Sequence, residues 1–336
     1  MKHTSTITLI LVAFFLITQL IGLSMISTEV QQTIIVGENQ SVVSINSTLI
    51  DEIPAMIFDW KAIIYLIVGI TIGTTLILVL KRFSFGGKLW KLWYFLAVYV
   101  AINFSLSLLF SMAGMRLIMI PILSTLTALA LAFLKVRRYN FYIHNLTEIL
   151  MYSGMAAFIV LLFNNNVLFV SILLFIIAIY DMIAVWKSKH MVALAEFTIK
   201  EKLFPGFAMN YQQVKNKTKI ITSQIKLNKK TSLDKQTKKA SKKQTKQSPR
   251  QAILGGGDVV FPLLFSGVVI GWLFNQGFTR MQSFGLSLII TATTTMALYL
   301  LFYYSKKDKF YPAMPFIAAG CYVGFALMYL VIFLLY

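Results

Sequence analysis

The 336-residue chain has few charged residues and almost no cysteine. Only 13% of its residues are charged, against roughly 25% in soluble proteins, while 58% are hydrophobic. This composition excludes an ordinary soluble domain and indicates an integral membrane protein. The single cysteine, Cys321, excludes a disulfide framework, and we expect it to pack as a small apolar residue. The three histidines form no His-Glu-x-x-His motif, so the sequence predicts neither a metal site nor a cofactor.

Nine apolar runs are long enough to cross a bilayer, which takes about 20 residues. The predicted spans are Thr6–Ile26, Ala62–Leu80, Leu92–Met112, Leu117–Leu134, Asn145–Phe163, Val167–Val185, Ile253–Phe274, Leu286–Tyr304 and Pro312–Leu335. The expected fold class is therefore an all-α membrane protein. We divide it into a six-helix part (1–190), a basic and largely disordered cytoplasmic loop (191–252) and a three-helix part (253–336). If the first span were instead a cleaved signal peptide, the topology of the rest would not change.

The basic residues fall almost entirely on one side of these spans. With the N-terminus cytoplasmic, all but three of the 31 lysines and arginines lie inside, the exceptions being Lys61, Arg116 and Arg280. The positive-inside rule therefore predicts a cytoplasmic N-terminus and a C-terminus outside.

Most of the net charge of +19 comes from the long inside loop. We expect residues Met191–Met209 to lie on the membrane surface and residues Lys215–Arg250 to be disordered, because the latter have no large apolar residue after Leu233. No aromatic residues are interleaved with these lysines, which argues against nucleic acid. A solvated tether or contact with anionic membrane lipids fits better.

Three of the twelve acidic residues lie inside apolar runs: Glu148, Asp181 and Asp258. A charge at membrane depth costs about 3 kcal/mol on insertion scales, so each is a functional candidate. Asp181 lies six residues before Lys187, and Asp258 lies eight residues after Arg250. At the rise of a helix, both acids then lie roughly 10 Å from the same side of the membrane. Glu148 begins its span, and we expect its side chain to extend to the interface.

Two carboxyls at one site titrate separately and share one proton over a wide pH range. One group can then accept a proton from water while the other donates to a carbonyl, as an aspartic protease requires. The same pair would also suit ion coupling in a transporter. The segment Tyr311–Pro315 favours catalysis, because two prolines at a helix start leave backbone groups free to hold an extended substrate. An ordinary helix-starting proline would explain only one of them.

Three motifs follow one another along the chain, on the sixth, seventh and ninth predicted spans. They are Tyr180-Asp181, Gly255-Gly256-Gly257-Asp258 and Pro312-Ala313-Met314-Pro315. Together they resemble the presenilin and signal peptide peptidase family of intramembrane aspartyl proteases, whose pattern is Tyr-Asp, Gly-x-Gly-Asp and Pro-Ala-Leu. The chain differs at Met314, where leucine is usual. The resemblance implies that Asp181 and Asp258 are catalytic. It also implies that the remaining residues shape the site: Tyr180, Gly255, Gly257, Pro312, Ala313, Met314 and Pro315.

The resemblance implies an aspartic endopeptidase that cleaves transmembrane protein substrates without a metal or cofactor. We expect a multi-pass protein of a microbial cell membrane, surrounded by lipids and of open oligomeric state. Its orientation resembles that of presenilin, which suggests substrates with their N-termini outside. The alternative is a proton-coupled transporter or channel that uses the same acids. Such proteins are expected to contain inverted repeats, and the sequence has no second copy of the motifs. A prepilin-peptidase-like enzyme shares Gly-x-Gly-Asp but lacks Pro-Ala-x-Pro and nine spans.

Overall fold

A computed structural model describes residues 5–29, 68–69, 71–73, 75, 86–137, 140–162, 166–188, 206–210, 251–305 and 311–335. Within these residues, eight helices are long and apolar enough to cross a membrane. They are α1 (Ser5–Glu29), α3 (Gly86–Met112), α4 (Ile120–Arg137), α5 (Phe141–Leu162), α6 (Val167–Ile183), α9 (Gly256–Asn275), α10 (Arg280–Tyr304) and α11 (Met314–Leu335). The prediction of a multi-pass helical membrane protein is confirmed. The predicted span Ala62–Leu80 lies mostly outside the described residues, so the ninth span and the orientation stay predictions.

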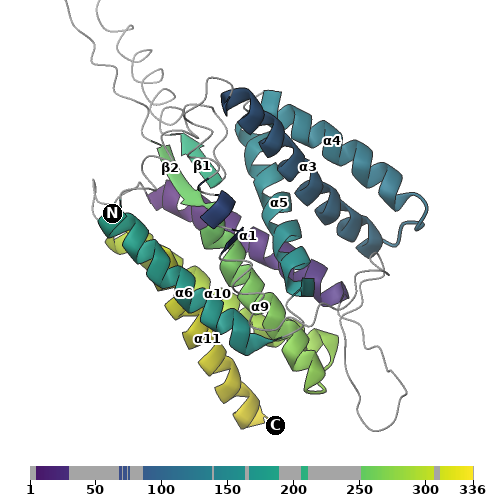
Figure 1. The fold of residues 1–336 in the computed structure, drawn as a ribbon. Helices are drawn as coiled ribbons and strands as arrows, with labels where there is room; N and C mark the ends of the chain where they lie inside the picture. Colours follow the sequence, from purple (N-terminus) through teal and green to yellow (C-terminus); the bar gives the residue numbers. More distant parts are fainter. Residues whose placement is uncertain are drawn as a thin grey trace, which may run out of the picture.

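Helix α9 lies at the centre of the bundle (Figure 1). It packs against α1, α5, α6, α10 and α11, and most of its side chains from Val259 onward are buried. Helices α3 and α4 lie together beside α5 on one side, whereas α6, α10 and α11 form the other side. The apolar runs become helices because a helix bonds its backbone groups within its own segment, as the bilayer interior requires. The residue Asp258 therefore begins the most enclosed part of the fold.

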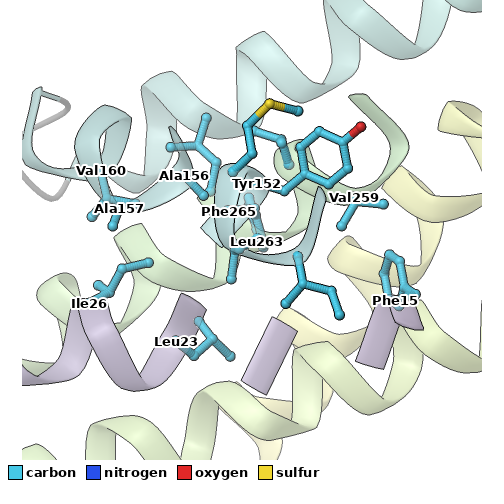
Figure 2. Close-up of a cluster of buried hydrophobic side chains, with 14 of the residues drawn as sticks. Phe15, Leu23, Ile26, Tyr152, Ala156, Ala157, Val160, Val259, Leu263 and Phe265 are labelled. Carbon is cyan, nitrogen blue, oxygen red and sulfur yellow. The ribbon is translucent and has the colours of Figure 1, made fainter. Parts of the chain in front are cut away.

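Small residues let the central helices approach closely. A Cβ on Gly267 of α9 would lie 2.6 Å from Cδ1 of Ile26 and 2.8 Å from Cγ2 of Val160, so α1 and α5 both pack against the bare backbone there. Figure 2 shows Ile26 and Val160 in the same buried cluster as Leu263 and Phe265. Helices in lipid associate through such packing, because the surrounding lipid tails are as apolar as the helices themselves.

A two-stranded sheet stands at the start of α9. Strand β1 (Gly206–Asn210) pairs antiparallel with β2 (Gln251–Gly255), and Gly206 lies opposite Gly255. Strand β2 runs directly into α9, which begins at Gly256. The pairing satisfies backbone groups that the helix does not reach.

These strands correct two predictions. The seventh span does not begin as a helix at Ile253, because residues 253–255 belong to β2. Residues 206–209, expected in a surface segment, form most of β1. Hydropathy cannot separate a short apolar strand from the helix that follows it. The segment Lys215–Arg250, expected to be disordered, lies outside the described residues.

Candidate active site

Asp181 lies two residues before the end of α6, and its side chain is buried, with 6% exposure. Immediately afterwards the helix widens into a π-helical turn, η1 (Ala184–Ser188). Such distortions occur often at functional sites. The acid is therefore placed at the end of a regular helix, where the backbone geometry changes.

The start of α11 binds the Asp181 carboxyl. The backbone N–H of Met314 donates to Oδ2 at 3.1 Å, and the backbone of Ala313 also hydrogen-bonds this carboxyl. The first N–H groups of a helix have no partner within it, and Pro312 and Pro315 have no N–H to offer. The Pro-Ala-Met-Pro segment thus presents two backbone donors. The sequence predicted free backbone groups here for a substrate, whereas in this structure two of them hold Asp181.

Asp258 is the third residue of α9 and is partly buried. The backbone of Gly255 hydrogen-bonds its carboxyl, and a Cβ on Gly255 would lie only 3.1 Å from its Oδ2. A negative charge in the first turn is favoured by the helix dipole. The missing side chain at Gly255 therefore gives the carboxyl its room, and the junction of β2 and α9 fixes where it stands.

The two acids approach each other because α6 packs against α9. Their carboxyls lie close enough for the charges to interact. The structure thus brings together the two residues that the sequence matched by depth alone. One buried acid and one partly exposed acid at a single site can hold a proton between them.

The other predicted residues lie around this pair in different ways. The side chain of Tyr180 is 51% exposed, and Gly257 is exposed. A Cβ on Gly257 would touch only the ring of Phe261, at 3.6 Å and 3.8 Å. The tightest of the three glycines is Gly256, where a Cβ would lie 2.5 Å from the hydroxyl oxygen of Tyr152.

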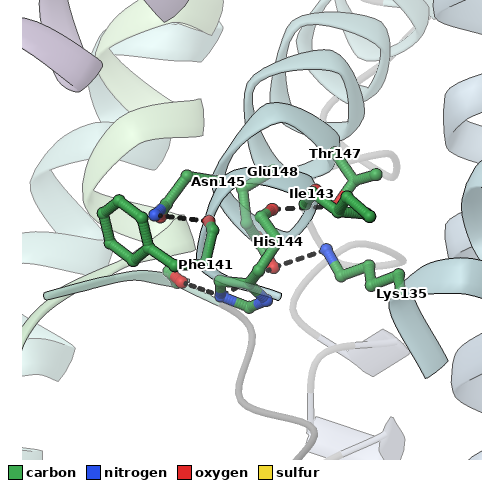
Figure 3. Close-up of polar contacts among 8 residues, drawn as sticks. Lys135, Phe141, Ile143, His144, Asn145, Thr147 and Glu148 are labelled. Atoms are coloured by element: carbon green, nitrogen blue, oxygen red, sulfur yellow. Dashed lines mark hydrogen bonds and ion pairs between the residues drawn. The ribbon is translucent and has the colours of Figure 1, made fainter. Parts of the chain in front are cut away.

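A buried charged cluster that the sequence did not predict joins α4 to α5 (Figure 3). The Lys135 ammonium donates to Oε1 of Glu148 at 2.6 Å, and both side chains are at most 1% exposed. Nε2 of His144 lies 3.7 Å from the same Oε1 and 2.9 Å from the carbonyl oxygen of Gly206.

This cluster corrects the prediction for Glu148. Its side chain does not extend to the interface, because it is fully buried and paired with Lys135 of α4. The only signal in the sequence was the spacing of His144, Glu148 and Tyr152, which puts them on one face of a helix. Among the described residues, no three His, Cys, Asp or Glu side chains gather as a metal ion would need.

Comparison with known proteins gives two kinds of match. A family model described as "Signal-peptide peptidase, presenilin aspartyl protease" matches residues 12–334. Two solved structures of a presenilin family intramembrane aspartate protease share the fold. The structure in space group C222 has 16% identity and a TM-score of 0.59, covering 96% of this chain and 99% of that chain. The structure in space group P2 has 15% identity and a TM-score of 0.54, covering 96% of each chain. No curated protein matches.

The family model covers nearly the whole chain and includes both acids, both strands and the start of α11. The solved structures confirm the fold over the same length. The chain therefore belongs to the signal-peptide peptidase and presenilin aspartyl protease family, and it is an aspartic endopeptidase that cleaves within the membrane.

Proposed function

We propose that Asp181 and Asp258 are the catalytic pair and that they activate water to hydrolyse a peptide bond within a transmembrane segment. The observation that carries this proposal is the approach of two carboxyls from α6 and α9 inside a bundle of apolar helices. Two bare charges would be costly at this depth. A pair that shares one proton is cheaper, and it is also the state that the reaction needs.

The reaction begins with one protonated and one ionised carboxyl. The ionised group takes a proton from water as the water oxygen attacks the scissile carbonyl carbon, and the protonated group donates to the carbonyl oxygen. The C–N bond of the resulting tetrahedral diol then breaks. The amine leaves with a proton from one carboxyl, and a diol hydroxyl returns a proton to the other. The pair ends with the single proton it began with, and no covalent intermediate forms.

The hydrogen bonds of Asp181 favour it as the ionised member. Two backbone N–H groups at the start of α11 face its carboxyl, and such donors stabilise a carboxylate. Asp258 has the dipole of α9 and, among the described residues, one backbone donor at Gly255, against two donors at Asp181. We therefore assign the proton to Asp258. This division gives each acid a role that follows from its own neighbours.

A substrate helix must unwind before it can react, because its carbonyls are bonded within the helix. Strand β2 runs directly into Asp258's helix, so an extended peptide added along β2 would bring its main chain beside that acid. Main-chain hydrogen bonds give such strand addition its affinity. The exposed Gly257 leaves space next to the carboxyl for the scissile bond. We propose that substrates are transmembrane proteins bound in this way.

We also propose nine spans with the N-terminus cytoplasmic, in a microbial cell membrane. The basic residues Lys81, Arg82, Lys88 and Lys91 precede the apolar part of α3 and favour an inside start for it. A span is then required between α1 and α3, where Ala62–Leu80 is apolar. The comparisons give no support to the alternative of a proton-coupled transporter.

The test uses Asp181→Asn and Asp258→Asn in purified protein reconstituted with a membrane-spanning substrate. We expect each change to lower cleavage by about 10²–10⁴-fold, since each removes a proton-transfer group, while yield and thermal midpoint stay near wild type. Asp234→Asn is the matched control, because it makes the same change in the basic loop. Full cleavage by either active-site variant would refute the proposed pair. A transition-state analogue that bears a hydroxyl should bind the wild-type protein and the Asp234→Asn control only.

A further inference from the structure

The Lys135–Glu148 ion pair is buried, so a position at the membrane interface does not explain its charges. Both side chains are enclosed by protein, and they come from α4 and α5, outside the pair of helices that carries the two aspartates. Replacing a buried ion pair by apolar residues of similar volume is often neutral or stabilising. Stability alone therefore does not account for a buried charge pair at this position. Its connections point to another role.

One connection runs through His144 to the sheet. A carbonyl oxygen can only accept, so Nε2 of His144 carries the hydrogen and donates to Gly206 at 2.9 Å. Gly206 is the residue of β1 that pairs with Gly255 of β2, and Gly255 hydrogen-bonds Asp258. The Glu148 carboxylate lies 3.7 Å from the same ring nitrogen, so its negative charge faces the N–H group and favours this placement of the imidazole electrostatically.

A second connection runs through Tyr152 to the helix start. Tyr152 lies one turn after Glu148 on the same face of α5, and its buried hydroxyl faces the Glu148 carboxylate. Neither this hydroxyl nor Oε2 of Glu148 has another hydrogen-bond partner among the described residues. Its ring lies against the bare Cα of Gly256, where a Cβ would come within 2.6 Å of two ring carbons. The ring also packs edge-on against Phe207 of β1 at 5.7 Å. Gly255 is thus held through the bond of His144 to Gly206, and Gly256 is held by the ring of Tyr152. These two glycines directly precede Gly257 and Asp258.

We propose that Glu148 is a positioning residue for the proteolytic reaction. Paired with Lys135, it holds His144 and Tyr152 so that they fix the Gly255–Gly256 junction, and thereby keep Asp258 opposite Asp181. This inference rests on the proposed catalytic pair. It assigns Glu148 no contact with substrate or with the reacting atoms. A misplacement of about 1 Å can cost roughly 100-fold in rate, so a support of this kind is visible in kinetics.

The first test compares Glu148→Gln with the double variant Lys135→Met/Glu148→Gln. The single variant leaves a buried unpaired charge, and we expect its melting temperature to fall; the double variant removes both charges and should regain it. We expect kcat for a membrane substrate to fall about 10- to 100-fold in both, with KM within about twofold of wild type. Thr147→Val is the matched control, because within the described part of the chain the Thr147 hydroxyl bonds to two carbonyls of α5 itself, and it should keep kcat.

The second test does not touch the ion pair, so it decides the question even if the first variants fail to fold. His144→Leu removes the donor to Gly206, and we expect a fall in kcat of about tenfold. His144→Gln keeps an amide N–H near the position of Nε2 and should restore most of it. The proposal is overturned if the double variant regains kcat with its melting temperature, or if His144→Leu keeps wild-type kcat. Asp258→Asn is measured in the same assay. If that variant cleaves normally, the proposed catalytic pair is wrong. If it is inactive while the Glu148 and His144 variants are fully active, only the positioning role of Glu148 is rejected.

Discussion

Replacing Gly256 by alanine adds one methyl group at the tightest point of the site. The new Cβ would lie 2.5 Å from the hydroxyl oxygen of Tyr152 and 2.6 Å from two of its ring carbons. Carbon atoms in contact lie about 3.5–4.0 Å apart, so the ring must retreat by about 1 Å. Tyr152 is 3% exposed and rests on Phe207, so the ring cannot retreat without moving β1 or α5.

The cost follows from this geometry. Overpacking by one methyl group in a tight core costs about 1–3 kcal/mol. Alanine gains at most about 1 kcal/mol over glycine in a helix interior, and Gly256 is the first residue of α9, where the gain is smaller. We therefore expect Gly256→Ala to destabilise the protein by about 1–2 kcal/mol net. Cleavage should fall as well, because the strain is placed two residues before Asp258.

The neighbouring glycine provides the control. Gly257→Ala adds the same methyl group, but its Cβ would make only ordinary contacts with Phe261, at 3.6 Å and 3.8 Å. Stability is measured by thermal and SDS-induced unfolding in detergent, followed by circular dichroism. Gly257→Ala should unfold at or above the wild-type midpoint and Gly256→Ala below it. If the two variants unfold together, or in the reverse order, the packing of Tyr152 against Gly256 is refuted.

A double-mutant cycle tests the named contact itself. Tyr152→Leu removes the ring that the methyl group meets, so Gly256→Ala should cost little in that background. The coupling free energy between the two positions should then be about 1–2 kcal/mol, in the range found for residues in contact. Additive effects would show that the cost of Gly256→Ala arises elsewhere.

Two further substitutions test how α11 is held. Gly324→Ala would put a Cβ 2.7 Å from the Cα of Ile290 on α10, so it should destabilise by about 1–3 kcal/mol, whereas Gly285→Ala, with nothing within 4 Å, should not; equal midpoints in detergent would contradict this contact. Tyr322→Phe removes the hydrogen bond from its hydroxyl to the carbonyl oxygen of Ser171 on α6, at 2.7 Å. We expect it to lower the free energy of unfolding by about 1 kcal/mol while cleavage is kept, and an unchanged unfolding midpoint would show that this bond contributes nothing.

The sequence was most informative where a residue contrasts with its surroundings. Aspartates 181 and 258 are conspicuous because each stands alone in an apolar run, and their spacing from basic residues already matched their depths. The helices were predictable for the same reason, since a long apolar run has few structures open to it in a bilayer. The approach of the two acids itself depends on how α6 packs against α9, which hydropathy does not encode.

The sequence is less informative about the contacts of residues at the ends of apolar runs. Glu148 and Lys135 each resemble a side chain that reaches the interface, and only the packing of α5 against α4 shows that they bind each other. Strand β2 is apolar and continuous in sequence with α9, while forty residues of a basic segment, 211–250, separate it from its partner β1. A strand whose partner is that distant leaves no local pattern. Likewise, nothing in Gly255-Gly256-Gly257 tells which glycine meets a neighbour.

The backbone and the side chain of residue 314 have separate functions, and together they explain why methionine is accepted there. Its backbone N–H donates to Asp181, and any residue except proline supplies that group. Its side chain is 4% exposed and belongs to the hydrophobic core, so the position also requires an apolar side chain of fixed volume. Methionine and leucine have similar volumes and exchange in cores at little cost. The methionine here, where the family pattern has leucine, therefore keeps both functions of the position. What the Pro-Ala-Met-Pro segment must preserve is a helix start with two free N–H groups aimed at Asp181.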